Sequence, residues 1–505
     1  MQIVKSIVRQ ITSKRHEKIK QFSQSPEETQ QKQLASLLKD AKDTEWGKKY
    51  NFKDIKSYST FNERLPIQTY EDIKSYVDRM KHGEQNILWN SNIKWFSKSS
   101  GTTNDKSKFI PVSRETLWKC HYRGALDVMT IYQENYPDNL FFKGKGLTLG
   151  GSQKINTFTN APNSYYGDLS AILIHNIPWW FRSMRTPKPS IALMEEWEEK
   201  RKKGAQATIH QNVTSISGVP SWYLVLIKRI LEITKADNLH DVWPNLEVFF
   251  HGGVNFSPYR EQYQKLIPSS KMHYQETYNA SEGFFAIQDD PSISAMLLML
   301  DYGIFYEFVP LEDIDKENPK VLTIGEVELD KNYAMLITTN SGLWRYVLGD
   351  TVILKSKYPH RIIISGRTKH FINAFGEEVI IDNAEKALLA ACKKTNAIVS
   401  EYTAAPVFIS TLNKGKHQWL IEFEKLPDNM TVFTDTLDKT LQEINSDYEA
   451  KRYKDINLEI LEVVPARKGL FLDWFKQRGK LGGQHKVPRL SNNRQYMDLL
   501  LEMNK

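Results

Sequence analysis

Four short segments carry the residue types that could bind ATP and activate a carboxylic acid as an adenylate. In chain order they are Ser99-Ser100-Gly101-Thr102-Thr103, Tyr278-Asn279-Ala280-Ser281-Glu282, Gly349-Asp350 and Gln484-His485-Lys486. The first is typical of a loop around phosphate oxygens, because glycine lets backbone N–H groups converge and hydroxyl groups donate hydrogen bonds. The others supply a carboxylate beside an aromatic ring, a carboxylate after a glycine, and a cation. Each segment alone is a weak signal, whereas adenylate formation needs all four roles.

The first segment is followed by Lys106 and Lys108, which add positive charge near the expected phosphates. A strand predicted over Asn92–Ser97 leads the chain into this turn. The loop lacks the second glycine of the Gly-x4-Gly-Lys-Ser/Thr phosphate loop. An ordinary polar hairpin turn is therefore the alternative interpretation.

The second segment places Tyr278, on which adenine could stack, four residues before Glu282, a hard oxygen ligand for Mg²⁺. Small residues between them leave room for the nucleotide, and Gly252-Gly253 upstream is a further candidate for ATP binding. In the third segment, Asp350 could accept hydrogen bonds from both ribose hydroxyls. The alternatives here are a capped strand end and a plain Gly-Asp turn.

The composition is that of a globular protein with more than one domain. The chain has 505 residues, 40% of them hydrophobic and 25% charged, and its net charge is +8. This mild excess of positive charge is compatible with anionic substrates and too diffuse to indicate nucleic-acid binding. Cys120 and Cys392 are the only cysteines, so neither a disulfide framework nor a zinc site is indicated, and a reducing cytoplasm is expected.

No apolar run reaches the roughly 18 residues that a membrane span needs, so no span is expected. The basic, apolar N-terminus, Met1–Lys20, could be a transit peptide or a membrane-surface helix. We favour an amphipathic first helix that packs on its own domain.

The elements that must position these residues change in character along the chain. Helices are predicted over Glu27–Lys42, Ser113–Tyr132, with Ser113 as its N-cap, and Pro220–Lys235. Short strands are predicted next, over Leu246–Phe250, Gly283–Ile287, Gly303–Val309, Gly325–Leu329, Ala334–Thr338, Val352–Leu354 and Arg361–Ile364. Helix and strand then alternate, over Glu377–Ala391, Gln418–Phe423, Met430–Asn445 and Asn457–Val464. We therefore predict a large α/β domain, residues 1–365, and a smaller α+β domain, residues 366–505.

Taken together, the four segments resemble the adenylate-forming superfamily of luciferases and acyl-CoA synthetases. They are most similar to the plant auxin-responsive acyl-acid amido synthetases of the Gretchen Hagen type and their bacterial relatives. That family's motifs are largely matched by Ser99–Lys108, Tyr278–Glu282, Tyr346–Asp350 and Gln484–Arg489. Asp105 and Val347 depart from the family pattern, where the loop has its second glycine and the third motif has an arginine.

The resemblance implies an ATP- and Mg²⁺-dependent ligase that forms an acyl-adenylate and transfers the acyl group to an amine, expected to be an amino acid. It implies a large domain of β-sheets with flanking helices and a β-barrel part, and a small mobile C-terminal lid. Glu282 would hold Mg²⁺, and Lys486 would stabilise charge on the α-phosphate. The residues expected around ATP are Ser99, Ser100, Gly101, Thr102, Thr103, Lys108, Gly252, Gly253, Tyr278, Ser281, Asp350 and Arg367.

Two further roles are expected from the same resemblance. Lys369 lies in Gly366-Arg367-Thr368-Lys369, which is similar to the superfamily hinge between the two domains. The acyl substrate would lie in the large domain, where Arg123, Trp179 and Trp180 are candidates. Aromatic clusters of this kind are also common in protein cores.

Three other functions are considered. A dinucleotide site is disfavoured because Gly144–Gly150 has the spacing GxGxxxG and no helical pattern follows it. A CoA ligase of the same superfamily would use a thiol as the acceptor instead of an amine. A nucleotide-binding protein without turnover is the alternative from another class, although simple binding would need neither Glu282 nor Lys486.

Overall fold

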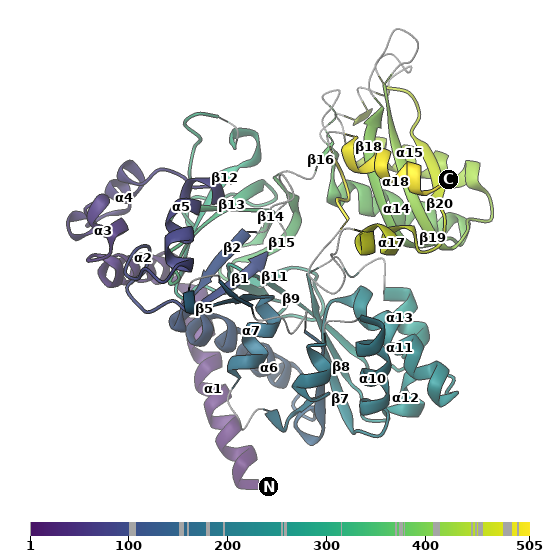
Figure 1. Ribbon diagram of the computed structural model, residues 1–505, viewed down its shortest axis with the longest axis horizontal. Helices are drawn as coiled ribbons and strands as arrows, with labels where there is room; N and C mark the ends of the chain where they lie inside the picture. The colour runs from purple at the N-terminus through teal and green to yellow at the C-terminus, as the bar shows by residue number, and fades with distance from the viewer. Residues whose placement is uncertain are drawn as a thin grey trace. The chain divides into compact units, whose positions relative to one another are not determined.

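The chain folds into two compact units, which we describe separately. The computed structural model describes residues 2–99, 108–150, 156–158, 161–177, 182–194, 197–253, 256, 260–314, 316–368, 371–372, 377, 379–407, 415–445, 448–449, 452, 458–477, 487–491 and 494–505. The larger unit comprises Met1–Leu348 and Val352–Ile363, and the smaller comprises Gly349–Thr351 and Ile364–Lys505 (Figure 1). This mixed α/β architecture, with a larger N-terminal and a smaller C-terminal part, confirms the predicted fold class.

Helices form the N-terminal part of the larger unit. They are α1 (Gln2–Gln24), α2 (Pro26–Ala41), α3 (Glu45–Lys49), α4 (Tyr58–Arg64) and α5 (Tyr70–Lys81). Helix α5 begins at a capping box, in which the Thr69 backbone N–H donates to the Asp72 carboxylate at 2.7 Å. This cap fixes the start of a helix that packs beside strand β2.

The first helix packs on the larger unit through its second half. Ile19 and Phe22 are buried, and the Arg15 guanidinium lies 2.6 Å from the Asp127 carboxylate and 2.5 Å from that of Asp301. These contacts agree with the packed helix that we favoured from the sequence. No helix among the described residues is both long enough and apolar enough to cross a membrane.

A four-stranded sheet carries the loop predicted to hold phosphates. Its order is β2 (Lys108–Val112), β1 (Trp95–Ser99), β5 (Ala161–Gly167) and β4 (Asn156–Phe158). Strands β1 and β2 are antiparallel, with Lys98 opposite Phe109 and Ser97 opposite Ile110. The connection between these two strands contains most of the first sequence segment.

An eleven-stranded sheet forms the centre of the larger unit. Its strands, in spatial order, are β12 (Ile304–Pro310), β13 (Asn332–Thr339), β14 (Tyr346–Ser356), β15 (Arg361–Arg367), β11 (Met296–Leu298), β10 (Gly283–Ile287), β9 (His273–Ala280), β8 (Val248–Gly252), β7 (Val213–Gly218), β3 (Lys145–Thr148) and β6 (Arg185–Thr186). Strands β6, β3, β7, β8 and β9 are mutually parallel, whereas β9, β10, β11 and β15 pair antiparallel. Strand pairing in this sheet therefore changes from parallel to antiparallel at β9.

Helices cover the parallel strands, as parallel sheets require. The helices of this part of the chain are α6 (Tyr122–Asn135), α7 (Leu169–Asn176), α9 (Pro189–Ala192), α10 (Trp197–Thr208), α11 (Pro220–Thr234), α12 (Leu239–Val242) and α13 (Arg260–Leu266). Among them, α7 packs on β1 and β5 of the four-stranded sheet. Figure 1 shows α10, α11 and α12 beside β7 and β8. Buried side chains of α11, such as Ile227 and Ile230, share one hydrophobic core with Ile216 of β7 and Phe249 of β8.

The smaller unit is a three-stranded sheet between two layers of helices. Its strands are β18 (Ile398–Val407), β19 (Lys416–Lys425) and β20 (Glu462–Ala466), with helices α14 (Ile381–Thr395), α15 (Met430–Ile444), α17 (Leu470–Gln477) and α18 (Gln495–Met503). Alternate residues of β19 face opposite sides: Trp419 packs with α14 and α15, and Leu420 packs with α17 and α18.

Several predicted elements differ from the structure. The helix predicted from Ser113 begins with that cap, since the Thr116 N–H donates to the Ser113 hydroxyl at 2.9 Å, but a π-helix over Thr116–His121 precedes α6. The strand predicted at 325–329 is wrong, because that segment forms turns. The helix predicted from Glu377 begins later, at Ile381, because β17 (Val379–Ile380) pairs with β16 (Phe371–Ile372).

A buried ion pair joins helix α4 to the central sheet. Arg345, 3% exposed, lies 3.1 Å from the carboxylate of Glu307, which is fully buried. The Arg345 guanidinium also donates to the backbone carbonyl of Asn62 at 3.0 Å, and the Tyr58 hydroxyl donates to Glu307 at 3.0 Å. Arg345 therefore supplies the positive charge that balances this buried carboxylate, and Tyr58 adds a neutral hydrogen bond.

We predict that Arg345→Met lowers the free energy of unfolding by about 3–5 kcal/mol, because it leaves a buried carboxylate without its cation. Urea denaturation would measure the change. Arg79→Met is the matched control: Arg79 pairs with Glu45 at the surface, 42% exposed, and its loss should lower the free energy of unfolding far less. Equal effects of the two substitutions would contradict the prediction.

Candidate active site

The second sequence segment lies at the carboxyl edge of the parallel strands. Strand β8 ends at Gly252 and β9 at Ala280, and their pairing places Gly252 beside Thr277. Ser281 and Glu282 form the turn from β9 into β10. Ligands of α/β sheets bind outside this edge, at the point where the strand order reverses. The structure thus brings Gly252, Tyr278, Ser281 and Glu282 to one edge.

The backbone geometry of this edge requires glycine at two positions. A Cβ atom on Gly252 would lie 2.3 Å from the Thr277 carbonyl oxygen, so only glycine fits between β8 and β9. Gly253 has φ +79°, which a residue with a side chain rarely adopts. Gly218, with φ +146°, ends β7 beside them and was not predicted.

A hydrogen bond joins this edge to the hairpin of the first segment. The Ser97 hydroxyl of β1 donates to the Ser281 hydroxyl at 2.9 Å, and both side chains are buried. Ser99 ends β1, and Lys108 begins β2 with its ammonium 5.9 Å from the centroid of the Tyr70 ring. Ser100, Gly101, Thr102 and Thr103 lie outside the described residues. Ser97 therefore holds the base of their loop against the turn that carries Glu282.

Glu282 lies close to buried Tyr346, a residue of the third motif that was not predicted to lie near Glu282. Glu282 is 7% exposed, and the Tyr346 hydroxyl is buried with no hydrogen-bond partner among the described residues. Burial raises the pKa of the Tyr346 phenol well above 10, and the charge of Glu282 adds to the rise. The phenol therefore stays protonated. A buried hydroxyl of this kind beside a carboxylate favours a site completed by a bound ligand or water.

Two aromatic side chains stiffen the same edge. The ring of Tyr278, 5% exposed, packs 4.9 Å from that of Phe285. His251 stacks on Phe256 at 4.2 Å, and its Nδ1 has no partner among the described residues. Burial, with a smaller contribution from the charge of Arg260, lowers the pKa of His251 to about 3. His251 is therefore neutral at physiological pH.

The start of helix α6 packs next to the Glu282 turn. The Phe284 N–H donates to the Cys120 sulfur at 3.1 Å, and a Cβ atom on Gly124 would lie 2.5 Å from the Phe284 ring. Burial raises the pKa of the Cys120 thiol to about 12, so this thiol is structural and not a nucleophile. Arg123, a candidate for the acyl substrate, is half-buried between these two contact residues in sequence.

Of the remaining predicted site residues, the structure describes Asp350 and Arg367. Asp350, 8% exposed, belongs to the smaller unit, where Gly349 accepts a hydrogen bond from the Thr368 N–H at 2.9 Å. Arg367 ends β15. The other four, Trp179, Trp180, Lys369 and Lys486, lie outside the described residues. Among the described residues, no group of three His, Cys, Asp or Glu side chains could hold a metal ion.

Solved structures identify the class of this fold. The chain is similar to the AtGH3.15 acyl acid amido synthetase in complex with 2,4-DB, with TM-score 0.80, 18% identity, and coverage of 96% of this chain and 95% of that one. It is also similar to 2-hydroxyisobutyryl-CoA ligase in complex with 2-HIB-AMP, with TM-score 0.60, 12% identity and coverage of 94% and 90%. The fold is therefore the one that these two ligases share.

The sequence identifies the family within this class. It matches the GH3 family N-terminal domain over residues 15–272, the central domain over 297–367 and the C-terminal domain over 382–495. Indole-3-acetic acid-amido synthetase GH3.3 of Arabidopsis thaliana is 23% identical, over 95% of this chain and 92% of the relative. The 4-substituted benzoates-glutamate ligase GH3.12 of the same plant is 22% identical, over 85% and 87%. The chain belongs to the GH3 family.

We predict that Ser97→Ala destabilises the fold by about 1–3 kcal/mol and raises the KM for ATP, because the buried Ser281 hydroxyl loses its partner. Ser281→Ala should have a similar cost. The double variant should cost less than the sum of the two, since no orphaned hydroxyl remains. Urea denaturation of all four proteins measures this coupling, and strictly additive effects would contradict it.

Proposed function

We propose that this chain is an ATP-dependent acyl-acid amido synthetase. The family match across the chain supports this function, and the observation in the structure that carries it is the Ser97–Ser281 hydrogen bond. That contact holds β1, the strand that precedes the hydroxyl-rich segment in the sequence, beside the turn that carries Glu282. The substrates are a small carboxylic acid, ATP and an amine, which we take to be an amino acid.

The reaction has two steps. An oxygen of the substrate carboxylate attacks the α-phosphorus of ATP, the bond to the β-phosphate breaks, and pyrophosphate leaves. The amine nitrogen then attacks the acyl carbon of the adenylate, the bond to AMP breaks, and the nitrogen loses its proton. Lys486 stabilises the charge that builds on the α-phosphate in the first step.

The residues at the strand edge are assigned to ATP in this proposal. The loop from Ser99 to Thr103, with Lys108, holds the phosphates, and Gly252 and Gly253 let the backbone approach the nucleotide. Tyr278 supports the adenine, and Asp350 and Arg367 contact the ribose. Arg123, Trp179 and Trp180 remain our candidates for the acyl pocket.

The residues at this edge fit a magnesium ion that ATP brings with it. Mg²⁺ is usually held by one or two carboxylates together with substrate phosphates. Glu282 supplies one such carboxylate, and the Tyr346 hydroxyl beside it has no partner among the described residues. When bound, the ion neutralises phosphate charge.

The two parts of the chain have separate tasks in this proposal. Residues 1–365 bind ATP and the acid, and residues 366–505 form a lid that carries Lys486. Rotation about Lys369 brings Lys486 to the α-phosphate for the first step and removes it for the second. We place the reaction in the cytoplasm, where Cys120 and Cys392, which no disulfide joins, stay reduced.

The proposed function is tested with a panel of carboxylic acids, ATP, Mg²⁺ and pooled amino acids, with products identified by mass spectrometry. Amide conjugates with release of AMP and pyrophosphate are expected. A parallel reaction with CoA tests the other activity found on this fold, since a solved structure similar to this chain is a CoA ligase. Thioesters without amides would overturn the proposal in favour of CoA ligation.

We predict that Lys486→Ala lowers the rate of ATP–pyrophosphate exchange about 10²–10³-fold, the usual loss when a group that stabilises transition-state charge is removed. ATP binding, measured by calorimetry, should change little. Exchange at the rate of the parent protein would remove Lys486 from the catalytic step.

We predict that Glu282→Gln raises the Mg²⁺ concentration needed for half-maximal exchange, because the amide keeps the shape of the side chain and loses its charge. Glu261→Gln, on the exposed start of α13, is the matched control and should behave like the parent. A parent-like Mg²⁺ dependence of Glu282→Gln, with parent-like turnover, would make Glu282 structural.

A further inference from the structure

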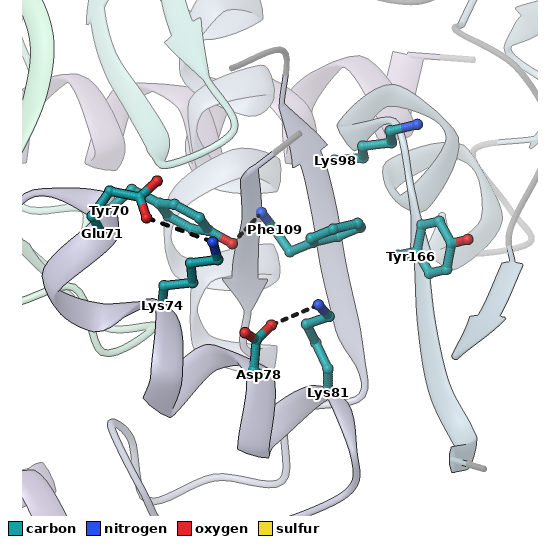
Figure 2. Close-up of a pocket in the computed structure, with 8 residues that line it drawn as sticks. All are labelled: Tyr70, Glu71, Lys74, Asp78, Lys81, Lys98, Phe109 and Tyr166. Carbon is teal, nitrogen blue, oxygen red and sulfur yellow. Dashed lines mark hydrogen bonds and ion pairs between the residues drawn. The ribbon is translucent and has the colours of Figure 1, made fainter. Parts of the chain in front are cut away.

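A pocket lies on the larger unit between helix α5 and the four-stranded sheet. Its volume is about 360 Å³, within the usual range for small-molecule pockets. Helix α5 and strands β1, β2 and β5 supply its walls, as Figure 2 shows. The lining residues are Tyr70, Glu71, Lys74, Asp78, Lys81, Lys98, Phe109 and Tyr166.

This pocket is on the opposite face of the sheet from the candidate active site. Neighbouring side chains on a strand point to opposite faces, so Lys98 points away from the face of Ser97, which bonds Ser281. Phe109 is the register partner of Lys98, and Tyr166 that of Phe96, so all three side chains share the pocket face. The pocket is therefore separate from the edge that carries Glu282.

The charges of the pocket leave one cation in excess. The Lys74 ammonium lies 3.6 Å from the Glu71 carboxylate, and that of Lys81 lies 2.7 Å from Asp78. Both pairs are within α5. Lys98 is exposed and has no carboxylate partner among the described residues. The lining thus has a net positive charge, which an anion would balance.

Aromatic rings form the surface between the lysines. The rings of Phe109 and Tyr166 meet edge to face, 5.2 Å apart, and the Lys81 ammonium lies 4.4 Å from the Phe109 centroid. In Figure 2 the Phe109 ring lies between the side chains of Lys81 and Lys98. A flat ring could pack on this surface while its anionic group reached Lys98.

The pocket also touches the base of the phosphate loop. Lys98 and Phe109 face each other on the two strands that the loop connects. The Phe109 N–H donates to the Tyr70 hydroxyl at 2.9 Å, which ties the hairpin to α5. Burial raises the pKa of Tyr70 to about 12, so the hydroxyl keeps its proton at neutral pH. A ligand in the pocket would contact both ends of the loop at once.

We propose that this pocket binds a small organic anion with an aromatic ring and that its occupancy holds Lys98 of β1 and Phe109 of β2 in place, lowering the KM for ATP. The ring packs on Phe109 and Tyr166, and the anionic group bonds Lys98. A phosphate ester and an aromatic carboxylate share this chemistry. Binding of the anion to this pocket does not depend on the proposed function. The effect on the KM for ATP does rest on the proposed function.

The test uses calorimetry with phenyl phosphate and with benzoate, in the presence of saturating α,β-methylene-ATP to fill the nucleotide site. Lys98→Met should weaken binding of the pocket ligand about tenfold or more, as expected for a lost charged hydrogen bond. Lys94→Met, an exposed lysine on the same segment outside the pocket, is the matched control and should bind like the parent.

The outcomes distinguish a phosphate ester from an aromatic carboxylate as the ligand. Sensitivity of phenyl phosphate binding to Lys98→Met assigns a phosphate ligand, and sensitivity of benzoate binding assigns a carboxylate. The proposal is overturned if neither probe binds the parent, if Lys98→Met binds both probes as the parent does, or if the analogue abolishes binding. In exchange assays the bound probe should lower the KM for ATP in the parent and in Lys94→Met only. Absence of exchange activity in every variant would count against the proposed function and leave the binding result intact.

Discussion

The hydrogen bond between Ser97 and Ser281 is the constraint on which the arrangement of the candidate site depends. It joins two sheets that share no strand, one carrying the segment predicted to hold phosphates and the other carrying Glu282. Both hydroxyls are buried, so water cannot replace either partner and the geometry is fixed by the protein alone. The end of β1 therefore stays beside the turn that carries Glu282.

Buried ion pairs likewise hold the surrounding helices to their neighbouring elements. Arg15 holds α1 to Asp127 of α6, and Arg345 holds α4 to Glu307 of β12. Burying each ion pair removes both charges from water, which costs desolvation energy. The pairs therefore contribute more to the specificity of helix packing than to the free energy of unfolding. Asp127, which Arg15 holds, lies one turn after Gly124, through which α6 contacts Phe284 of β10. The position of Arg123 relative to β10 thus depends on a residue of the first helix.

Local sequence patterns predicted the helices and strands that have regularly spaced apolar residues. Helix α2, helix α11 and strand β10 have close to their predicted bounds, because apolar spacing and Pro at the helix start are local signals. The contact of Ser97 with Ser281 joins residues 184 positions apart, and no local pattern encodes it. The late start of α14 has the same cause, since Val379–Ile380 is held as a strand by pairing with Phe371–Ile372. The Tyr346 hydroxyl likewise shows its significance only through its burial beside Glu282.

The path of the chain between the two units bears on the proposed rotation. Residues Gly349–Thr351 group with the smaller unit, although β14 continues into the larger one on both sides. The Gly349 carbonyl accepts a hydrogen bond from the Thr368 N–H, and the Ser365 hydroxyl donates to that of Thr351 at 2.9 Å. These bonds link Asp350, the ribose ligand in our proposal, to the segment just before Lys369, and all of the bonded residues group with the smaller unit. In the proposed reaction, the contact of Asp350 with the ribose would therefore depend on the same segment that leads into the hinge at Lys369.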